Sequence, residues 1–345
     1  MTDNTWPTVD TELIDDVTLY SAKLIIPVTG PVIIDGAVAI HGDRVVHVGK
    51  RRWVLKALKQ EMTAHGTIHE RHWDGVLTPG LINAHTHLQY SGMVQVGQGT
   101  YDRFRAWELA FNEVYAEAQK TQPWKQWAED GARQMVESGT TAAADIVTDL
   151  DAAGALASQG MHGIAYWEVM GWHNAEWMEK GRTELIRQLR RMNEEQLPNL
   201  GISPHAPYTL ESEPFVDLPD IARQLNMRLH IHLAETPLEA GTYPPVLTTY
   251  SAADWSDHDW ESYRQLKEVG KGASAIQFVD QLGSLGPDVH IAHGVWANGE
   301  DRRILRQRGV GVALCPRSNR ITNTGKDAPV REYLEEGNLV SVGTD

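Results

Sequence analysis

The sequence contains a single cysteine and fewer basic than acidic residues. Cys315 is the one cysteine among 345 residues, so an internal disulfide is excluded and a reducing, cytoplasmic location is expected. Lys and Arg number 31 against 46 Asp and Glu, which gives a net charge of −15. Such a surface repels phosphate backbones and anionic lipids, so neither nucleic acid nor a membrane is an expected partner.

Long apolar runs are also missing from the sequence. No run approaches the roughly 18 residues that a membrane-spanning helix needs. Residues 1–16 hold five acids and no Lys or Arg, unlike the basic start of a secretory signal. Histidine is abundant instead, with 15 residues. A histidine-rich, cysteine-poor sequence of globular composition raises the question of metal binding through imidazole.

The sequence divides into an N-terminal tail, a β-rich part and a long part in which strands and helices alternate. Residues 1–16 are the tail, and residues 17–75 contain short β segments separated by turn residues, which predicts a small antiparallel unit. In residues 76–345, short apolar runs alternate with amphipathic stretches, as in parallel βα units. The runs are 81–84, 141–146, 163–169, 200–205, 229–233, 289–293, 310–315 and 339–345.

Eight such runs predict an α/β fold, a (β/α)8 TIM barrel. The last run ends at Asp345 and leaves no residues for an eighth helix, so the barrel is expected to be truncated after its eighth strand. Residues 236–274 form an insertion that is too long and too polar for a simple βα turn. This insertion is either a lid or a solvent-exposed excursion, and the sequence leaves both interpretations open.

Several of the predicted strands end in residues that bind metals. Alternation along a strand directs residues i and i+2 to the same side, so a His-x-His pair can converge on one ion. A single such pair more often consists of packed or exposed histidines than of metal ligands. Four strand ends that each deliver His or Asp favour one site at the carboxyl face of a barrel. The residues are His85, His87, His230, His232, His293 and Asp345.

Six stretches, taken together, resemble the amidohydrolase superfamily, in its branch of deaminases and triazine chlorohydrolases. They lie in order over most of the chain, at residues 78–88, 203–209, 230–236, 290–295, 315–319 and 342–345. The resemblance implies a (β/α)8 barrel flanked by a β-sandwich, to which residues 17–75 would contribute. It also implies a hydrolytic enzyme that depends on a metal ion.

The resemblance assigns a metal site to four matched residues. His85, His87, His232 and Asp345 would bind one divalent ion, Zn²⁺ or alternatively Fe²⁺. His230 would be the member of its pair that packs within the strand. No lysine lies at a strand end where a bridging ligand would be expected, which favours a single ion over two.

The remaining matched residues would carry the chemistry and the substrate. Glu235 resembles the proton shuttle, His293 the residue that orients water and leaving group, and His205 a substrate contact. Asp345 would accept the proton of the attacking water. Three imidazoles and a carboxylate leave an open position on a Zn²⁺-like ion, which lowers the pKa of a bound water from 15.7 to about 7.

Two arginines follow the seventh predicted strand at the mouth of the barrel. Arg317 and Arg320 offer guanidinium groups that suit a carboxylate at the distal end of a substrate. The alternative is that both pair with acids of residues 254–261 or face solvent.

The implied function is hydrolytic deamination of an aminated heterocycle, with release of ammonia. The matched stretches favour a small adenosine-type nucleoside such as methylthioadenosine, S-adenosylhomocysteine or aminofutalosine. A metal and a shuttle do not define the leaving group, so a chlorohydrolase or a ring-amide hydrolase is an alternative. A catalytically inactive, truncated barrel is another. The sequence is compatible with a homo-oligomer.

Overall fold

A computed structural model describes residues 13–194, 197, 199–241, 266 and 269–345 of the protein. The chain forms two compact units, Met1–Gly80 and Leu81–Asp345, and each is described by itself. The boundaries expected at residues 16 and 75 stay predictions. Most of the insertion at 236–274 lies outside the described residues, and so do the acids of residues 254–261.

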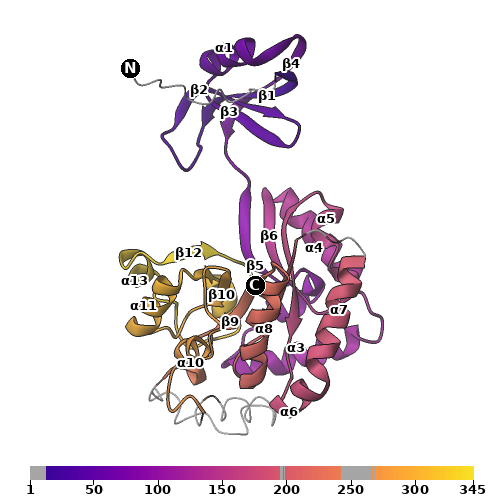
Figure 1. The fold of residues 1–345 in the computed structure, drawn as a ribbon, viewed down its shortest axis with the longest axis vertical. Helices are drawn as coiled ribbons and strands as arrows, with labels where there is room; N and C mark the ends of the chain where they lie inside the picture. Colours follow the sequence, from indigo (N-terminus) through magenta and orange to yellow (C-terminus); the bar gives the residue numbers. More distant parts are fainter. Residues whose placement is uncertain (1–12, 195–196, 198, 242–265, 267–268) are drawn as a thin grey trace, which may run out of the picture. The chain divides into compact units, whose positions relative to one another are not determined.

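The first unit is a four-stranded sheet with one helix packed on it (Figure 1). The strand order is β3-β2-β1-β4; β1 pairs antiparallel with β2 but parallel with β4. The expectation of a purely antiparallel unit was therefore wrong, because helix α1 carries the chain from β3 at one edge to β4 at the other. The elements are β1 (Ile14–Ile25), β2 (Ile33–His41), β3 (Arg44–Lys50), α1 (Arg51–Glu61) and β4 (Met62–Leu77).

Helix α1 is held to the sheet by an apolar stripe and an ion pair. Val54 and Leu58, four residues apart on one helical face, are buried against the sheet. At the start of the helix, Nε and Nη2 of Arg51 donate to the two carboxylate oxygens of Glu70 on β4, each at 2.6 Å. These hydrogen bonds from Arg51 lower the pKa of Glu70 to about 2.

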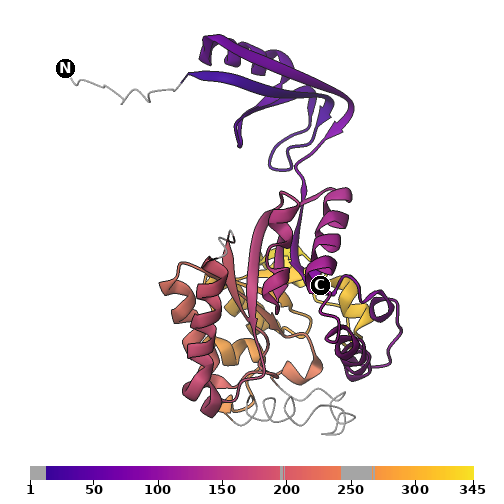
Figure 2. The same cartoon turned by 90° about the vertical axis from the view of Figure 1, so that its right-hand side faces the viewer.

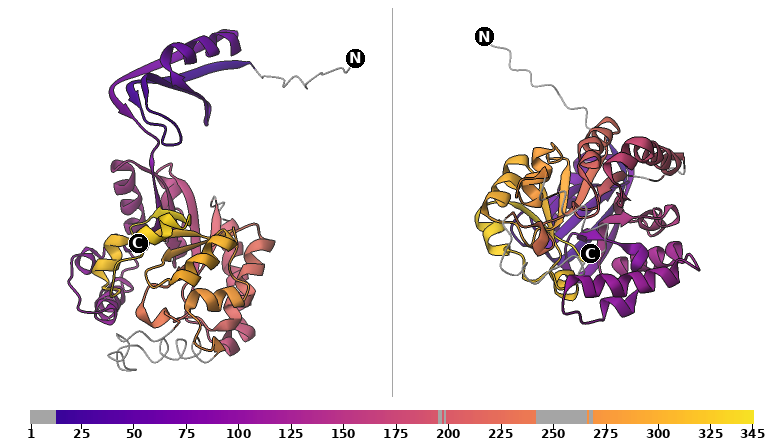
Figure 3. Two further views of the ribbon diagram at one scale, coloured as in Figure 1. Left: turned by 90° about the vertical axis from the view of Figure 1, so that its left-hand side faces the viewer. Right: turned by 90° about the horizontal axis from the view of Figure 1, so that it is seen from below.

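The second unit is a barrel of eight parallel strands with helices outside it, which confirms the predicted fold class (Figures 1 and 2). The view from below in Figure 3 shows the helices around the strands. All eight predicted runs form strands, in sequential order from β5 to β12. The strands are β5 (Leu81–Thr86), β6 (Thr140–Val147), β7 (His162–Val169), β8 (Leu200–Pro204), β9 (Arg228–Leu233), β10 (Val289–His293), β11 (Gly311–Leu314) and β12 (Leu339–Val342).

Helices connect these strands and cover them from outside. On α8, Phe215 and Leu218 are fully buried, as is Leu229 on β9. Within the described part of the chain, no helix is long and apolar enough to cross a bilayer. The helices are η1 (Leu88–Tyr90), α2 (Val94–Gly97), α3 (Phe104–Ala118), α4 (Trp124–Glu137), η2 (Leu150–Ala152), α5 (Ala155–Ser158), α6 (Asn174–Glu176), η3 (Trp177–Gly181), α7 (Arg182–Glu194), α8 (Ser212–Gln224), η4 (Pro237–Glu239), α10 (Ala275–Gln281), α11 (Gly299–Arg308), α12 (Pro316–Ile321) and α13 (Val330–Glu335).

The first and last barrel strands are joined where they end. The backbone N–H groups of Thr344 and Asp345 both donate to the carbonyl oxygen of His85, each at 2.9 Å. The side chain of Asn83 adds two bonds: its Nδ2 donates to Thr344 Oγ1 at 2.8 Å, and its Oδ1 accepts from Thr344 N–H at 3.1 Å. The residues after β12 are thereby fixed against β5.

A buried tyrosine supports the turn that follows β10. Tyr333 is fully buried, and its hydroxyl donates to the carbonyl of Gly294 at 2.9 Å. Gly294 has a φ of 59°, which glycine adopts without strain. The turn comes directly after His293, so Tyr333 links α13 to that strand end.

We expect Tyr333→Phe to reduce the free energy of unfolding by about 1–3 kcal/mol, because the buried Gly294 carbonyl loses its partner. Urea unfolding, followed by tryptophan fluorescence and by circular dichroism, measures the change. An unchanged free energy of unfolding would mean that the Gly294 carbonyl is satisfied in another way.

Candidate active site

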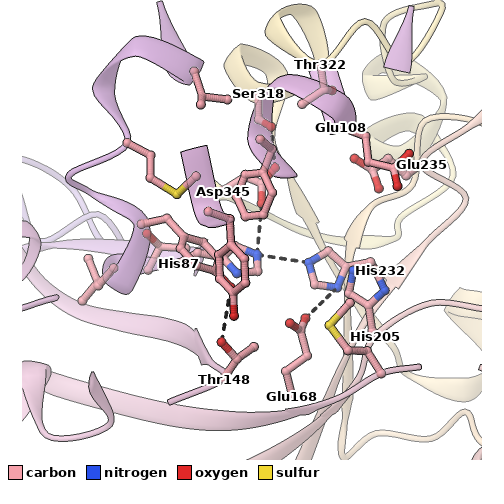
Figure 4. Close-up of a pocket in the computed structure, with 18 of the residues that line it drawn as sticks. His87, Glu108, Thr148, Glu168, His205, His232, Glu235, Ser318, Thr322 and Asp345 are labelled. Carbon is pink, nitrogen blue, oxygen red and sulfur yellow. Dashed lines mark hydrogen bonds and ion pairs between the residues drawn. The ribbon is translucent and has the colours of Figure 1, made fainter. Parts of the chain in front are cut away.

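Four strand ends bring imidazole and carboxylate groups together at one end of the barrel. One ligand atom from each of His85, His232, His293 and Asp345 lies within 4.8 Å of the others. His87 joins this group, because its Nε2 lies 3.2 Å from His232 Nε2 and 3.3 Å from Asp345 Oδ1 (Figure 4). The structure thus places all four residues of the expected metal site next to one another.

The donor set of this cluster fits a divalent metal ion. The two Nε2 atoms of His87 and His232 face each other at hydrogen-bond distance, a geometry typical of two ligands directed at one ion. Burial lowers the pKa of His85 to about 4 and that of His232 well below its usual value, so both rings are neutral and offer lone pairs. His85 Nε2 lies 3.0 Å from Asp345 Oδ1.

Outer groups fix the orientation of these side chains. His230 Nε2 lies 2.9 Å from His85 Nδ1, and the two rings stack with centroids 4.8 Å apart. The residue expected only to pack in its strand therefore supports His85 directly. A metal-binding histidine commonly uses its second ring nitrogen for such a supporting contact. The hydroxyl of Ser318 donates to Asp345 Oδ2 and so orients that carboxylate.

His293 is held with one ring nitrogen directed into the site. Its Nδ1 lies 2.9 Å from Asn319 Oδ1, which can only accept, so Nδ1 carries the proton. The buried Nε2 has no hydrogen-bond partner among the described residues. It lies 3.6 Å from Glu235 Oε1 and 4.0 Å from Asp345 Oδ2. His293 is therefore positioned between the two carboxylates.

Glu235 follows strand β9 and is buried beside this cluster. The hydroxyl of Tyr208 donates to Glu235 Oε2 at 3.1 Å. Burial raises the pKa of Glu235. The backbone that carries Glu235 is fixed by Glu239, whose carboxylate accepts the N–H groups of Ala234, Glu235 and Thr236 at 2.8–2.9 Å. The spacing of Thr236 and Glu239 is that of a capping box, a signal already visible in the sequence.

A further carboxylate, Glu168, was not expected from the sequence. It lies near the end of β7, and its Oε1 is 3.8 Å from His232 Nδ1 (Figure 4). Neither of these two buried atoms has another partner in the described structure. Burial raises the pKa of Glu168 to about 7. The one sequence signal was its position at the end of the third predicted strand.

These groups open onto one large cavity of about 1220 Å³. His205 lines it, with its ring centroid 4.7 Å from that of His232 and its Nδ1 2.7 Å from Thr209 Oγ1. Burial lowers the pKa of His205 to about 3. Arg317 also lines the cavity, whereas Arg320 is exposed and pairs with Asp327 at 3.3 Å. The substrate contact expected at Arg320 stays a prediction.

Comparisons with known proteins agree with the fold. The model of the amidohydrolase family matches residues 76–243 and 246–345. The chain is 29% identical over 333 residues to 5-methylthioadenosine/S-adenosylhomocysteine deaminase of Moorella thermoacetica, covering 93% of this chain and 68% of that protein. The enzyme of the same name from Thermococcus kodakarensis is 30% identical over 276 residues, covering 78% of this chain and 58% of that protein.

A solved structure shares the fold. An adenosine deaminase from Xanthomonas campestris with bound zinc superposes with a TM-score of 0.70 at 21% identity, covering 97% of this chain and 70% of that one.

Proposed function

This chain belongs to the amidohydrolase family, and on that premise we propose that it is a metal-dependent hydrolytic deaminase of an aminated heterocycle. The observation that carries the proposal is the position of Glu235: a buried carboxyl group beside a histidine and aspartate cluster, at the wall of a cavity. The names of the relatives support an adenosine-type substrate.

The proposed metal ligands are His85, His87, His232 and Asp345, for one ion, with Zn²⁺ preferred and Fe²⁺ as the alternative. A bound ion of this kind would lower the pKa of water to about 7, so that hydroxide is available at neutral pH. The carboxylate of Glu168, whose Oε1 lies 3.8 Å from His232 Nδ1, would favour the proton on that nitrogen through its charge and so leave Nε2 free to bind the ion.

Glu235 would move the protons of the reaction. Hydrolytic deamination forms a C–O bond at the amino-substituted ring carbon and breaks its C–N bond, so the adjacent ring nitrogen and the leaving amine each need a proton. The attacking water supplies both protons: one carboxyl group can carry the first to the ring nitrogen and the second, released from the new hydroxyl group, to the leaving amine. The hydrogen bond from Tyr208 keeps Oε2 in place and leaves Oε1 turned towards His293.

Asp345 and His293 would handle the attacking water. The carboxylate of Asp345 can accept a water proton, while the hydrogen bond from Ser318 orients its Oδ2. His293 Nε2 faces both carboxylates and can bind the new oxygen and the departing ammonia. The same groups can act on another leaving group, so a dechlorination assay with a chlorinated triazine accompanies the deamination assays.

The proposed substrate is a small adenosine-type nucleoside of the methylthioadenosine, S-adenosylhomocysteine or aminofutalosine type. The cavity exceeds the roughly 300–1,000 Å³ of usual small-molecule sites, which leaves room beyond an aminated purine ring and its sugar.

The metal proposal predicts that the purified protein carries close to one equivalent of a divalent ion. His87→Ala is expected to lose the ion and turnover, because it removes a ligand nitrogen. The control is His162→Ala. His162 is exposed at the start of strand β7, away from the cluster, so this variant should keep both the ion and turnover. Elemental analysis gives the metal content. Wild-type protein that binds no divalent ion at micromolar concentration would contradict the proposal.

Glu235→Gln tests the proton transfer. The amide keeps the size of the side chain but cannot exchange protons, so we expect a loss in kcat on the order of 10²-fold or more with full metal content. Steady-state deamination and elemental analysis are measured on the same preparation. Loss of metal in parallel with activity would show that Glu235 is a ligand or a structural group.

Arg317→Ala tests recognition of an anion at the cavity. For S-adenosylhomocysteine, whose carboxylate lies remote from the ring, we expect kcat/KM to fall by about 1.5–3 kcal/mol, or roughly 10- to 150-fold. Adenosine, which lacks the anion, should be affected little. Arg320→Ala, at the other predicted contact, is measured in parallel; because that side chain is exposed and paired with Asp327, we expect a smaller loss than for Arg317→Ala. Equal losses on both substrates would reject the role of Arg317.

A further inference from the structure

Helix α3 carries a row of aromatic residues along one face. Phe104, Trp107, Phe111 and Tyr115 are spaced by three, four and four residues, which places them on the same side of a helix. Such a stripe usually packs into a core. Here all four line the cavity of the candidate active site, and only Phe104 is fully enclosed by the protein.

The aromatic rings form a continuous wall. Trp107 and Phe111 have ring centroids 5.5 Å apart, and Phe111 and Tyr115 5.8 Å apart. The ring of Tyr90 meets Phe111 edge-on at 5.1 Å. We call these four residues, together with Phe104, the aromatic wall.

The aromatic wall contacts the candidate site at two places. At one end, the ring centroid of Phe104 lies 6.3 Å from that of Tyr208, which donates to Glu235. Beside the central ring, Phe111, the ring of Tyr90 stacks on His87 with centroids 5.8 Å apart. The wall is therefore part of the same site, and a molecule held at Glu235 can extend a substituent along it.

Charge does not interrupt the wall. Glu108 lies on the same face of α3 and lines the cavity (Figure 4). Its carboxylate is paired with Arg105 at 2.6 Å. Both of these side chains are less than one-fifth exposed. The pair is neutral as a unit, so the surface beside it stays suited to an apolar group.

We propose that the aromatic wall binds a ring-containing apolar substituent of the substrate, remote from the aminated ring. This inference rests on the proposed function and narrows its substrate class to nucleosides with an aryl substituent. Aromatic rings gain edge-to-face or offset stacking energy in addition to burial of their area, which a short alkyl group does not.

The test compares 5′-phenylthio-5′-deoxyadenosine with methylthioadenosine, which differ only in that substituent. For the wild-type protein, kcat/KM is expected to be about 10-fold or more higher with the phenylthio compound. Phe111→Leu should reduce this ratio about fivefold, because it removes the central ring of the wall. Leu109→Ala is the matched control on the exposed face of α3, where Leu109 is 53% exposed, and should leave the ratio unchanged.

The possible results separate the two proposals. Equal kcat/KM for the two compounds, or the same loss for both in Phe111→Leu, overturns the aryl subsite and leaves deamination intact. If metal-loaded protein deaminates neither compound, and neither adenosine nor S-adenosylhomocysteine, the proposed function fails. Binding at the aromatic wall is then tested by calorimetric titration with 5′-phenylthio-5′-deoxyinosine and its methylthio counterpart. Tighter binding of the phenylthio compound, reduced in Phe111→Leu, supports the aryl subsite. Equal binding of the two compounds rejects it.

Discussion

The candidate site depends on the hydrogen bonds that join the two ends of the barrel. Eight parallel strands can meet only if the last returns to the first, and here the carbonyl of His85 accepts the N–H groups of Thr344 and Asp345. Asn83 adds two side-chain bonds to Thr344. The same contact places the carboxylate of Asp345 against the imidazoles of His85 and His87. The hydrogen bonds that close the barrel therefore also assemble the cluster.

A largely buried carboxylate among imidazoles needs further partners, and these form a second layer around the cluster. Burial alone would raise the pKa of Asp345, but hydrogen bonds with His85 and His87 hold it well below its usual value. His230, Asn319 and Ser318 each orient one member of the cluster. The three residues lie on β9 and α12, so the precision of the site comes from elements of the barrel itself.

The strands and the histidine pairs could be predicted from local sequence patterns. Contacts between residues distant in the sequence could not. A His-x-His pair after an apolar run indicates its own geometry, because the side-chain period of a strand is two. Helix α1 was missed within a segment read as β, and the parallel pairing of β1 with β4 follows from that helix. Glu168 and Tyr208 acquire their positions only when separate strands and loops meet. Glu239 is different, since its capping box with Thr236 was present in the sequence.

The cavity has a polar side, formed by the strand ends, and an aromatic side, formed by helix α3. The strand ends supply polar groups that interact more strongly where water is excluded. The stripe on α3 leaves Trp107, Phe111 and Tyr115 partly exposed, which costs about 25 cal/mol for each Å² of apolar area left in water. A bound substituent that covers those rings removes that cost and displaces water from the mouth beside Glu235. Binding at the aromatic wall and proton transfer at the strand ends would thus reinforce each other.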